Sequence, residues 1–124
     1  MNDLAKLGQA GEKQAERFLK KQGYRIVTRN YGCAGGELDI VALDGKTIVF
    51  IEVKTRSSAD HADPQDAVTP VKQQRVINAA KTFIQHTHSQ DRAYRFDVVA
   101  ITLDDDKPAK IELFKNAFSP GQPG

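Results

Sequence analysis

The sequence predicts a single α/β domain in which helices flank a central mixed β-sheet. Helix-like and strand-like patterns alternate along the chain, and two neighbouring runs are apolar at consecutive positions. The 124 residues are enough for one core and too few for two. We therefore expect one domain over residues 1–118, followed by a flexible tail rich in Pro and Gly over residues 119–124.

The first expected element is a helix that has Asp3 as its N-cap and ends at Gly23. Small and apolar residues recur in it at steps of three and four: Leu4, Leu7, Gly11, Ala15, Phe18 and Leu19. Residues 24–30 are rich in strand formers and predict a strand. Residues 31–36 are glycine-rich and predict a loop.

The next two expected strands are residues 37–43 and 46–54, which flank the dipeptide Asp44-Gly45. This dipeptide is favoured in two-residue type I′ turns, so the strands should pair antiparallel. Their central residues are apolar at successive positions, which indicates that both faces of the sheet are covered.

The second half of the chain predicts a loop, a helix and two strands. Residues 57–67 are polar, and Thr69 followed by Pro70 is a typical helix start. The expected buried positions of this helix are Val76, Ile77, Ala80, Phe83 and Ile84. Residues 95–103 and 111–114 supply the last strands, with an acidic turn at residues 104–106 between them.

Composition narrows the class of protein. Hydrophobic residues at 40% and charged residues at 27% are typical of soluble globular proteins. Cys33 is the only cysteine, which excludes an intramolecular disulfide and a tetrathiolate zinc site. The charged N-terminus lacks the apolar stretch of a signal peptide, so we expect a cytoplasmic protein with no membrane association.

The most informative side chains are Glu37 and Asp39 on one expected strand and Glu52 and Lys54 on the next. With the turn at its expected position, Asp39 lies opposite Phe50, and Glu37 lies opposite Glu52. Because side chains alternate along a strand, all four charged groups should project from one face. Three carboxylates gathered there are costly to bury without a compensating cation.

A divalent metal ion would offset this repulsion. Mg²⁺, or Mn²⁺ in its place, accepts one or two carboxylates and keeps water or phosphate in its other positions. Asp39 and Glu52 suit this role, the carbonyl of Val53 offers a further ligand, and Lys54 could act on water or phosphate. Phosphodiester hydrolysis is the favoured reaction. An E-x-K triplet also occurs as a salt bridge on a solvated strand edge, so the residues alone leave both interpretations open.

Residues 36–42 and 49–58 resemble the YraN-like family of bacterial endonucleases, as do residues 8–19, 72–80 and 95–100. This family is identified with the PD-(D/E)xK nuclease superfamily and is similar to archaeal Holliday-junction resolvases. The resemblance implies a restriction-endonuclease-like, three-layer, nuclease-like domain. It also implies an Mg²⁺-dependent endodeoxyribonuclease that acts on DNA, including branched or structured DNA.

Carried onto this sequence, the resemblance assigns Asp39 to the acidic position and Glu52 and Lys54 to E-x-K. Glu12 matches a helix glutamate that completes many resolvase-like sites, although a solvated helix glutamate is an equal alternative. Leu38 stands where the superfamily motif has proline, which contributes backbone shape and no ligand.

The expected nucleic-acid contacts are Lys72, Gln73, Arg75 and Arg56, the first of which lie at a helix N-terminus. Two other functions stay open: a non-catalytic nucleic-acid-binding module on a nuclease fold, and a protein-interaction domain. An enzyme that cuts two strands symmetrically works most simply as a two-fold homodimer, although no segment marks an interface.

Overall fold

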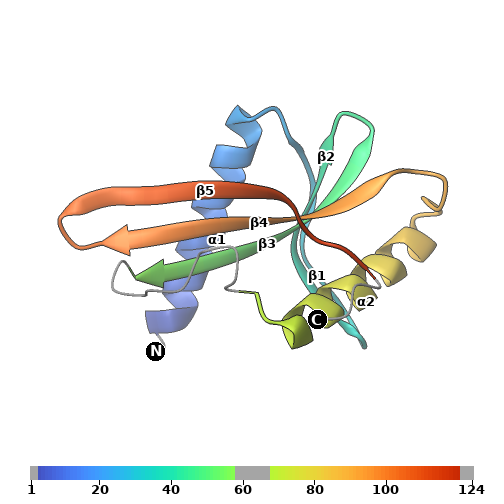
Figure 1. The fold of residues 1–124 in the computed structure, drawn as a ribbon, viewed down its shortest axis with the longest axis horizontal. Coiled ribbons are helices and arrows are strands. Elements are labelled where there is room, and N and C mark those ends of the chain that lie inside the picture. Colours follow the sequence, from blue (N-terminus) through green and yellow to red (C-terminus); the bar gives the residue numbers. More distant parts are fainter. Residues whose placement is uncertain (1–2, 58–67, 121–124) are drawn as a thin grey trace.

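The computed structural model describes residues 3–57 and 68–120, without the side chains of residues 3–9. Within these residues, two helices and five strands follow one another in the order α1, β1, β2, β3, α2, β4, β5 (Figure 1). Their bounds are α1 Asp3–Lys21, β1 Arg25–Cys33, β2 Gly36–Asp44, β3 Thr47–Ser57, α2 Pro70–His86, β4 Tyr94–Asp104 and β5 Lys107–Phe118.

The five strands form one sheet in the order β1-β2-β3-β4-β5. β3 and β4 run parallel, joined through α2, and the other neighbours are antiparallel, so the sheet is mixed. α1 packs on one face and α2 on the other, which confirms the predicted three-layer α/β architecture. None of the described helices has an apolar stretch long enough to cross a lipid bilayer.

Both faces of the central strands are buried, as their continuous apolar sequence predicts. On β3, Val49 packs toward α1 and the next residue, Phe50, packs toward α2, and both are fully buried. The α2 side is aromatic at its centre, where Phe50 contacts Phe83 and Phe96 with ring centroids 5.8 Å and 5.5 Å apart. Edge-to-face pairs such as Phe50–Phe83 add to the burial energy of the rings.

The start of α2 is confirmed at the predicted residues. Thr69 is the N-cap, and its hydroxyl oxygen accepts a hydrogen bond from the Lys72 backbone N–H at 3.2 Å. Pro70 occupies the first turn, where its missing N–H costs no hydrogen bond. The cap therefore fixes the position on α2 from which the Lys72 side chain projects.

The loop predicted over residues 31–36 is wrong, because β1 continues to Cys33 and β2 begins at Gly36. Tyr31 is held in the strand by an edge-to-face contact with Phe83 of α2, with ring centroids 5.4 Å apart. At Gly36, a Cβ atom would collide with the carbonyl group of Arg75. Glycine is therefore required here for close packing of β2 against α2 and does not mark a loop.

The turn between β2 and β3 also differs from the prediction by one residue. Asp44 pairs with Thr47, so Gly45 and Lys46 form the turn, with Gly45 at a positive φ of 61°. Glycine at the first central position is the type II′ pattern, which also suits hairpins. Asp44 stays in the strand because its carboxylate accepts a hydrogen bond from Arg95 Nη2 at 2.9 Å.

The remaining differences concern the ends of elements. α1 includes Asp3, which was expected to precede it as a cap, and β5 is longer than the predicted strand over residues 111–114. β5 was underestimated because its flanks are polar edge-strand residues. Most of the expected loop and tail, residues 58–67 and 121–124, lies outside the described residues.

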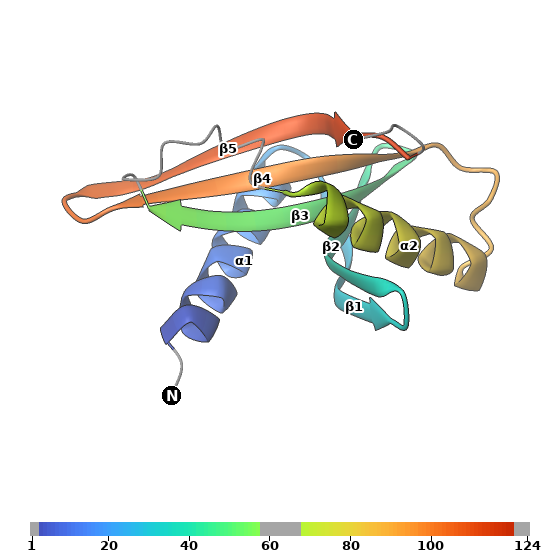
Figure 2. The same cartoon turned by 60° about the horizontal axis from the view of Figure 1, so that its bottom comes forward.

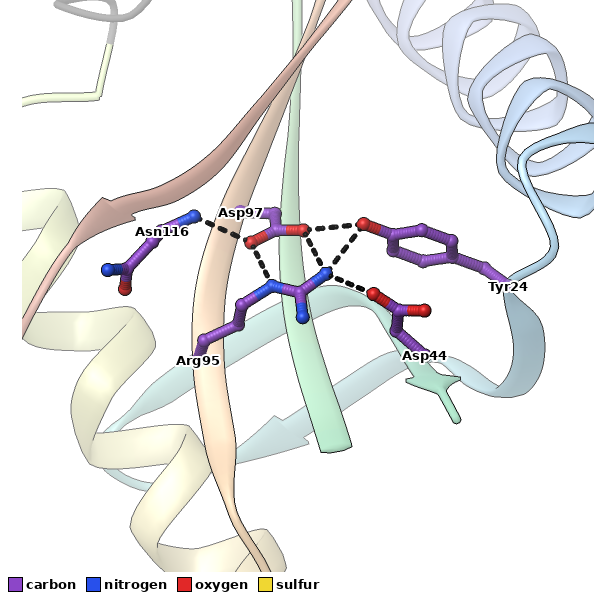
Figure 3. A network of polar contacts seen from close by, with 5 residues as sticks. All are labelled: Tyr24, Asp44, Arg95, Asp97 and Asn116. Atoms are coloured by element: carbon purple, nitrogen blue, oxygen red, sulfur yellow. Dashed lines mark hydrogen bonds and ion pairs between the residues drawn. The ribbon is translucent and has the colours of Figure 1, made fainter. Parts of the chain in front are cut away.

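A buried polar network joins β2, β4 and β5 to the segment before β1 (Figure 3). The Asp97 carboxylate, fully buried on β4, accepts hydrogen bonds from Tyr24 Oη at 3.0 Å and Arg95 Nε at 3.0 Å. It also accepts one from the Asn116 backbone N–H at 2.9 Å, at an irregularity where Asn116 has a φ of 54°. Burial, followed by the charge of Asp97, raises the pKa of Tyr24 to about 12.

Candidate functional site

The candidate site lies where β2 and β3 stop pairing. Their register runs from Asp44–Thr47 to Ile40–Ile51, and the next residue on each strand is Asp39 and Glu52. Beyond this point the β1–β2 hairpin leaves the sheet of β3, β4 and β5 and runs beside α2 (Figure 2). The two carboxylates therefore stand at the fork between diverging strands.

This register corrects the predicted one, in which Asp39 faces Phe50 and Glu37 faces Glu52. The shift is two residues, an even number, so the shift alone turns no side chain to the other face of the sheet. Its consequence is favourable for the predicted chemistry, because Asp39 now stands beside Glu52.

β2 turns about its own axis at Asp39. Leu38 belongs to the core on the α2 side, whereas Ile40 belongs to the core on the α1 side, although residues two apart normally share a face. On the neighbouring strand, Asn30 has a positive φ of 51°. Asparagine tolerates this conformation better than most residues. The local twist carries Asp39 toward β3.

A cleft of about 340 Å³ opens at this point, which we call the carboxylate cleft. Its lining comes from α1, β2, β3, α2 and the segment before α2, namely Glu12, Asp39, Glu52, Val53, Lys54, Val68, Thr69 and Lys72. Six of these eight were named from the sequence. The structure thus brings together residues that are up to 60 positions apart in the chain.

Glu52 is the most constrained side chain of the cleft. It is 5% exposed, and its Oε1 lies 3.4 Å from Nζ of Lys72. Its Oε2 is buried and has no hydrogen-bond partner among the described residues. Burial, and then the charge and hydrogen bond of Asp39, raise the pKa of Glu52 to about 9. The site therefore disfavours the charged carboxylate unless further positive charge arrives.

Asp39 is oriented by the backbone of the partner strand. Its Oδ2 accepts a hydrogen bond from the Val53 backbone N–H at 2.9 Å, across the fork. This bond fixes one oxygen and directs the carboxylate toward Glu52. Val53 itself lines the cleft.

Glu12 reaches the cleft from α1, on the other side of the fork. A Cβ atom at the preceding residue, Gly11, would collide with the Thr55 side chain, so α1 and β3 approach closely here. Burial, followed by the charges of Asp39 and Glu37, raises the pKa of Glu12. Glu12 thus lies within the electrostatic field of the strand carboxylates, unlike a solvated helix glutamate.

The donor set fits a small oxygen-preferring cation. No three His, Cys, Asp or Glu side chains converge into a metal-binding group among residues 10–57 and 68–120. Asp39 and Glu52 form a pair instead. Mg²⁺ needs only one or two carboxylates, and the buried Oε2 of Glu52, which has no hydrogen-bond partner within residues 10–57 and 68–120, offers it a lone pair.

The other expected site residues lie outside the carboxylate cleft. Glu37 has an exposed side chain whose Oε1 is 3.9 Å from Lys72 Nζ. Gln73 donates a hydrogen bond to the Val68 carbonyl at 3.0 Å, and Arg75 is exposed on α2. Arg56 is half-buried on β3. Glu37 is thus accessible beside Lys72, a residue of the cleft, whereas Gln73 holds the segment before α2.

Sequence reasoning missed two lining residues and one contact. Val68 and Thr69 line the cleft because the cap of α2 is also its wall. The Thr69-Pro70 signal located the helix start, and nothing in the sequence placed that start against β3. For the same reason, the sequence did not predict the contact of Lys72 with Glu52.

The fold and this cleft define an α/β domain that carries paired carboxylates and lysines at a fork between its central strands. The family model described as "Uncharacterised protein family UPF0102" matches residues 11–101, so the chain belongs to that family, which is the YraN-like family it resembles. The matched region contains every residue that lines the carboxylate cleft.

Curated relatives of similar length carry the same family name. A UPF0102 protein of Geobacter metallireducens is 48% identical over 112 residues, covering 90% of this chain and 91% of the relative. One from Geotalea daltonii is 47% identical over 117 residues, covering 94% and 92%. One from Caldicellulosiruptor saccharolyticus is 45% identical over 113 residues, covering 90% and 96%.

Proposed function

We propose that this chain is a metal-dependent endonuclease of the PD-(D/E)xK type that hydrolyses phosphodiester bonds in DNA, including branched or structured DNA. The observation that carries the proposal is the pair Asp39 and Glu52 at the strand fork, with a buried Glu52 oxygen that has no described partner. A buried carboxylate oxygen without a donor is costly, and a bound cation removes that cost.

Asp39, Glu52 and the Val53 carbonyl would hold Mg²⁺ or Mn²⁺, with Glu12 close by. When bound, such an ion supplies positive charge for the phosphate oxygens and for an attacking water. The Asp39–Val53 hydrogen bond keeps both strands in register across the fork, which preserves the spacing of the carboxylates. Glu12 faces the same space from α1 and can hold a water molecule by hydrogen bonding.

Lys54 and Lys72 supply the positive charges that a phosphodiester needs. Lys54 is exposed at the mouth of the cleft, and Lys72 lies 3.4 Å from Glu52 Oε1. In hydrolysis, a water oxygen bonds to phosphorus while the bond from phosphorus to one ester oxygen breaks. The charge that develops on the phosphoryl oxygens is stabilised by cations already in place.

Cleavage by the purified protein tests the proposal directly. Linear, single-stranded, flapped and four-way DNA are incubated with Mg²⁺, Mn²⁺ or EDTA, beside the variants Asp39→Asn and Glu52→Gln. We expect metal-dependent cleavage that each variant lowers about 100-fold or more, because even residues that only orient metal ligands cost tenfold to 100-fold. Wild-type rates in either variant would reject the site.

Lys54 has a separate test, since an ammonium group does not ligate a metal. Lys54→Ala should retain Mn²⁺ and DNA binding and lose cleavage. We expect Lys54→Arg to recover part of the rate through its positive charge. An Arg variant as inactive as Ala would indicate that Lys54 transfers a proton, because Arg does not release one at neutral pH.

A non-catalytic nucleic-acid-binding module is the alternative, favoured by the same cationic residues around the cleft. It shares the fold and needs no metal. Calorimetry separates the two functions: absent Mn²⁺ uptake, or uptake that Asp39→Ala does not reduce, favours the binding module.

A further inference from the structure

A second cleft, of about 540 Å³, lies between α1 and the strands β1 and β2 and is larger than the carboxylate cleft. We call it the α1 cleft, and its charged lining comprises Glu12, Lys13, Glu16, Arg17, Lys20 and Arg29. α1 and β1 supply these side chains, with Asn30 and Ile40 completing the lining between them. None of the basic residues among them belongs to the nucleic-acid contacts expected from the sequence.

The charges of the α1 cleft do not cancel. Glu16 is already engaged by Arg29, whose Nε donates to Oε2 at 2.8 Å, and by Lys20, whose Nζ is 3.4 Å from Oε1. Lys13 and Arg17 are exposed and form no ion pair with any described carboxylate. The cleft therefore keeps two cations available for an external anion.

The spacing of these cations suits a chain of phosphates better than a single one. Lys13, Arg17 and Lys20 recur at steps of four and three, so they share one face of α1. From Lys13 to Lys20 the helix rises about 10 Å. One strand of a nucleic acid carries a charge about every 3.4 Å along its axis, so this face spans about three successive phosphates.

The α1 cleft and the carboxylate cleft meet at Glu12, which lines both. Ile40 lines the α1 cleft, and the residue before it on β2 is Asp39, at the fork. A strand lying along α1 thus leads directly to the carboxylates. On the opposite side of the carboxylate cleft, Lys72 of α2 provides the next cation.

We propose that the α1 cleft binds the sugar-phosphate backbone of a nucleic-acid strand and guides it past Glu12 into the carboxylate cleft. This inference deepens the proposed function and rests on it. Phosphate contacts position a strand without reading its bases, so the α1 cleft contributes affinity and register and leaves base selection to other surfaces.

The test measures DNA binding by the full chain through fluorescence anisotropy at several salt concentrations. EDTA is present so that no cleavage occurs. The variant is Lys13→Ala/Arg17→Ala. The matched control is Lys46→Ala/Lys81→Ala, which removes the same charge from exposed residues that line neither cleft and form no ion pair with a described carboxylate.

We expect the cleft variant to bind single-stranded DNA about tenfold or more weakly. The slope of the logarithm of its binding constant against the logarithm of salt concentration should become shallower by about 1.4, the value for two lost phosphate contacts. The control should bind like wild type. Equal losses in both variants, or no loss in the cleft variant, would overturn the inference. Displacement of the oligonucleotide by a mononucleotide at modest excess would also overturn it, since it would indicate a single-phosphate site.

The two proposals fail separately. A chain that binds DNA through Lys13 and Arg17 but cleaves none of the substrates in Mg²⁺ or Mn²⁺ refutes the nuclease and leaves the α1 cleft intact. A chain that cleaves DNA while the cleft variant binds normally refutes the α1 cleft alone. Circular dichroism of both double variants confirms that each is folded.

Discussion

Two carboxylates are buried on neighbouring strands of the same sheet, and their oxygens are satisfied very differently. Asp97 on β4 pairs in register with Ile51, the residue before Glu52 on β3. Both oxygens of Asp97 accept hydrogen bonds, from Tyr24, Arg95 and Asn116. Glu52 has one oxygen near Lys72 and another with no described donor. The hydrogen bonds of Asp97 are all made within the fold, whereas Glu52 keeps one oxygen that can accept an interaction from a ligand.

The comparison separates two uses of a buried charge. Donors from Tyr24, Arg95 and Asn116 satisfy both oxygens of Asp97, and the network ties β2, β4 and β5 together (Figure 3). At Glu52 the charge of a neighbouring carboxylate, Asp39, opposes ionisation. A fold gains nothing in stability from that arrangement, so a ligand is the better explanation.

The largest expected effect is on stability at Asp97. Asp97→Ala should lower the free energy of unfolding by about 3–5 kcal/mol, because it leaves Arg95 without its buried partner. It also removes the acceptor of the Tyr24 hydroxyl and of the Asn116 backbone N–H. Urea denaturation followed by circular dichroism measures this. Asp104→Ala removes an exposed ion pair with Lys107 and should cost less than about 1 kcal/mol. Equal urea midpoints for wild type and Asp97→Ala would show that Asp97 does not stabilise the fold.

Glu52→Gln should behave in the opposite way. In EDTA we expect no loss of melting temperature, since Gln places no negative charge beside Asp39. With Mn²⁺ at about 100 times its Kd, wild type should gain about 2.7 kcal/mol and Glu52→Gln almost nothing. Glu112→Gln, on β5, is the control that should keep the gain. A large loss of stability in EDTA would make Glu52 a structural residue like Asp97.

The pH dependence of stability sharpens the same contrast. The folded-state pKa of Glu52 is raised from 4.5 to about 9, so the folded protein holds a proton that the unfolded chain releases. Its contribution to stability is therefore present at low pH and lost as pH rises through this window. The slope is at most about 1.4 kcal/mol per pH unit. Urea midpoints in EDTA between pH 5 and pH 9 should show this loss in wild type, and Glu52→Gln should show less of it.

The smallest effect is expected at Lys72, whose ammonium group competes with a metal ion for Glu52 Oε1. Lys72→Ala should bind Mn²⁺ about fivefold more tightly, since a partly exposed ion pair is worth up to about 1 kcal/mol. Isothermal calorimetry measures the affinity, and Lys81→Ala on the same helix is the control. Weaker Mn²⁺ binding by Lys72→Ala would mean that Lys72 organises the site and does not compete for it.

Much of the fold follows from local sequence patterns. The capped start of α2 depends on Thr69 and Pro70 alone, and the continuous apolar run of β3 requires cover on both faces. The loop wrongly expected at residues 31–36 shows the limit. Gly36 is a glycine because α2 packs against it, and a contact across 39 positions leaves no local signal.

The site was predictable in its strand residues and not in its surroundings. Alternation places Glu52 and Lys54 on one face of β3, and a register error of two residues does not change that face. The contacts of Lys72 and Glu12 depend on how α2 and α1 sit on the sheet, which no spacing in the sequence encodes. The family resemblance supplied Glu12, and only the structure places it beside both clefts.

The missing side chain at Gly36 has a consequence for the distance between the two carboxylates. Gly36 touches the Arg75 carbonyl group, and Asp39 lies three residues further along the same strand. Any side chain at Gly36 would push the β1–β2 hairpin away from α2, and Asp39 would move with it, while Glu52 stays with β3. The contact between Gly36 and the Arg75 backbone therefore sets the distance between the Asp39 and Glu52 carboxylates, although neither carboxylate takes part in it.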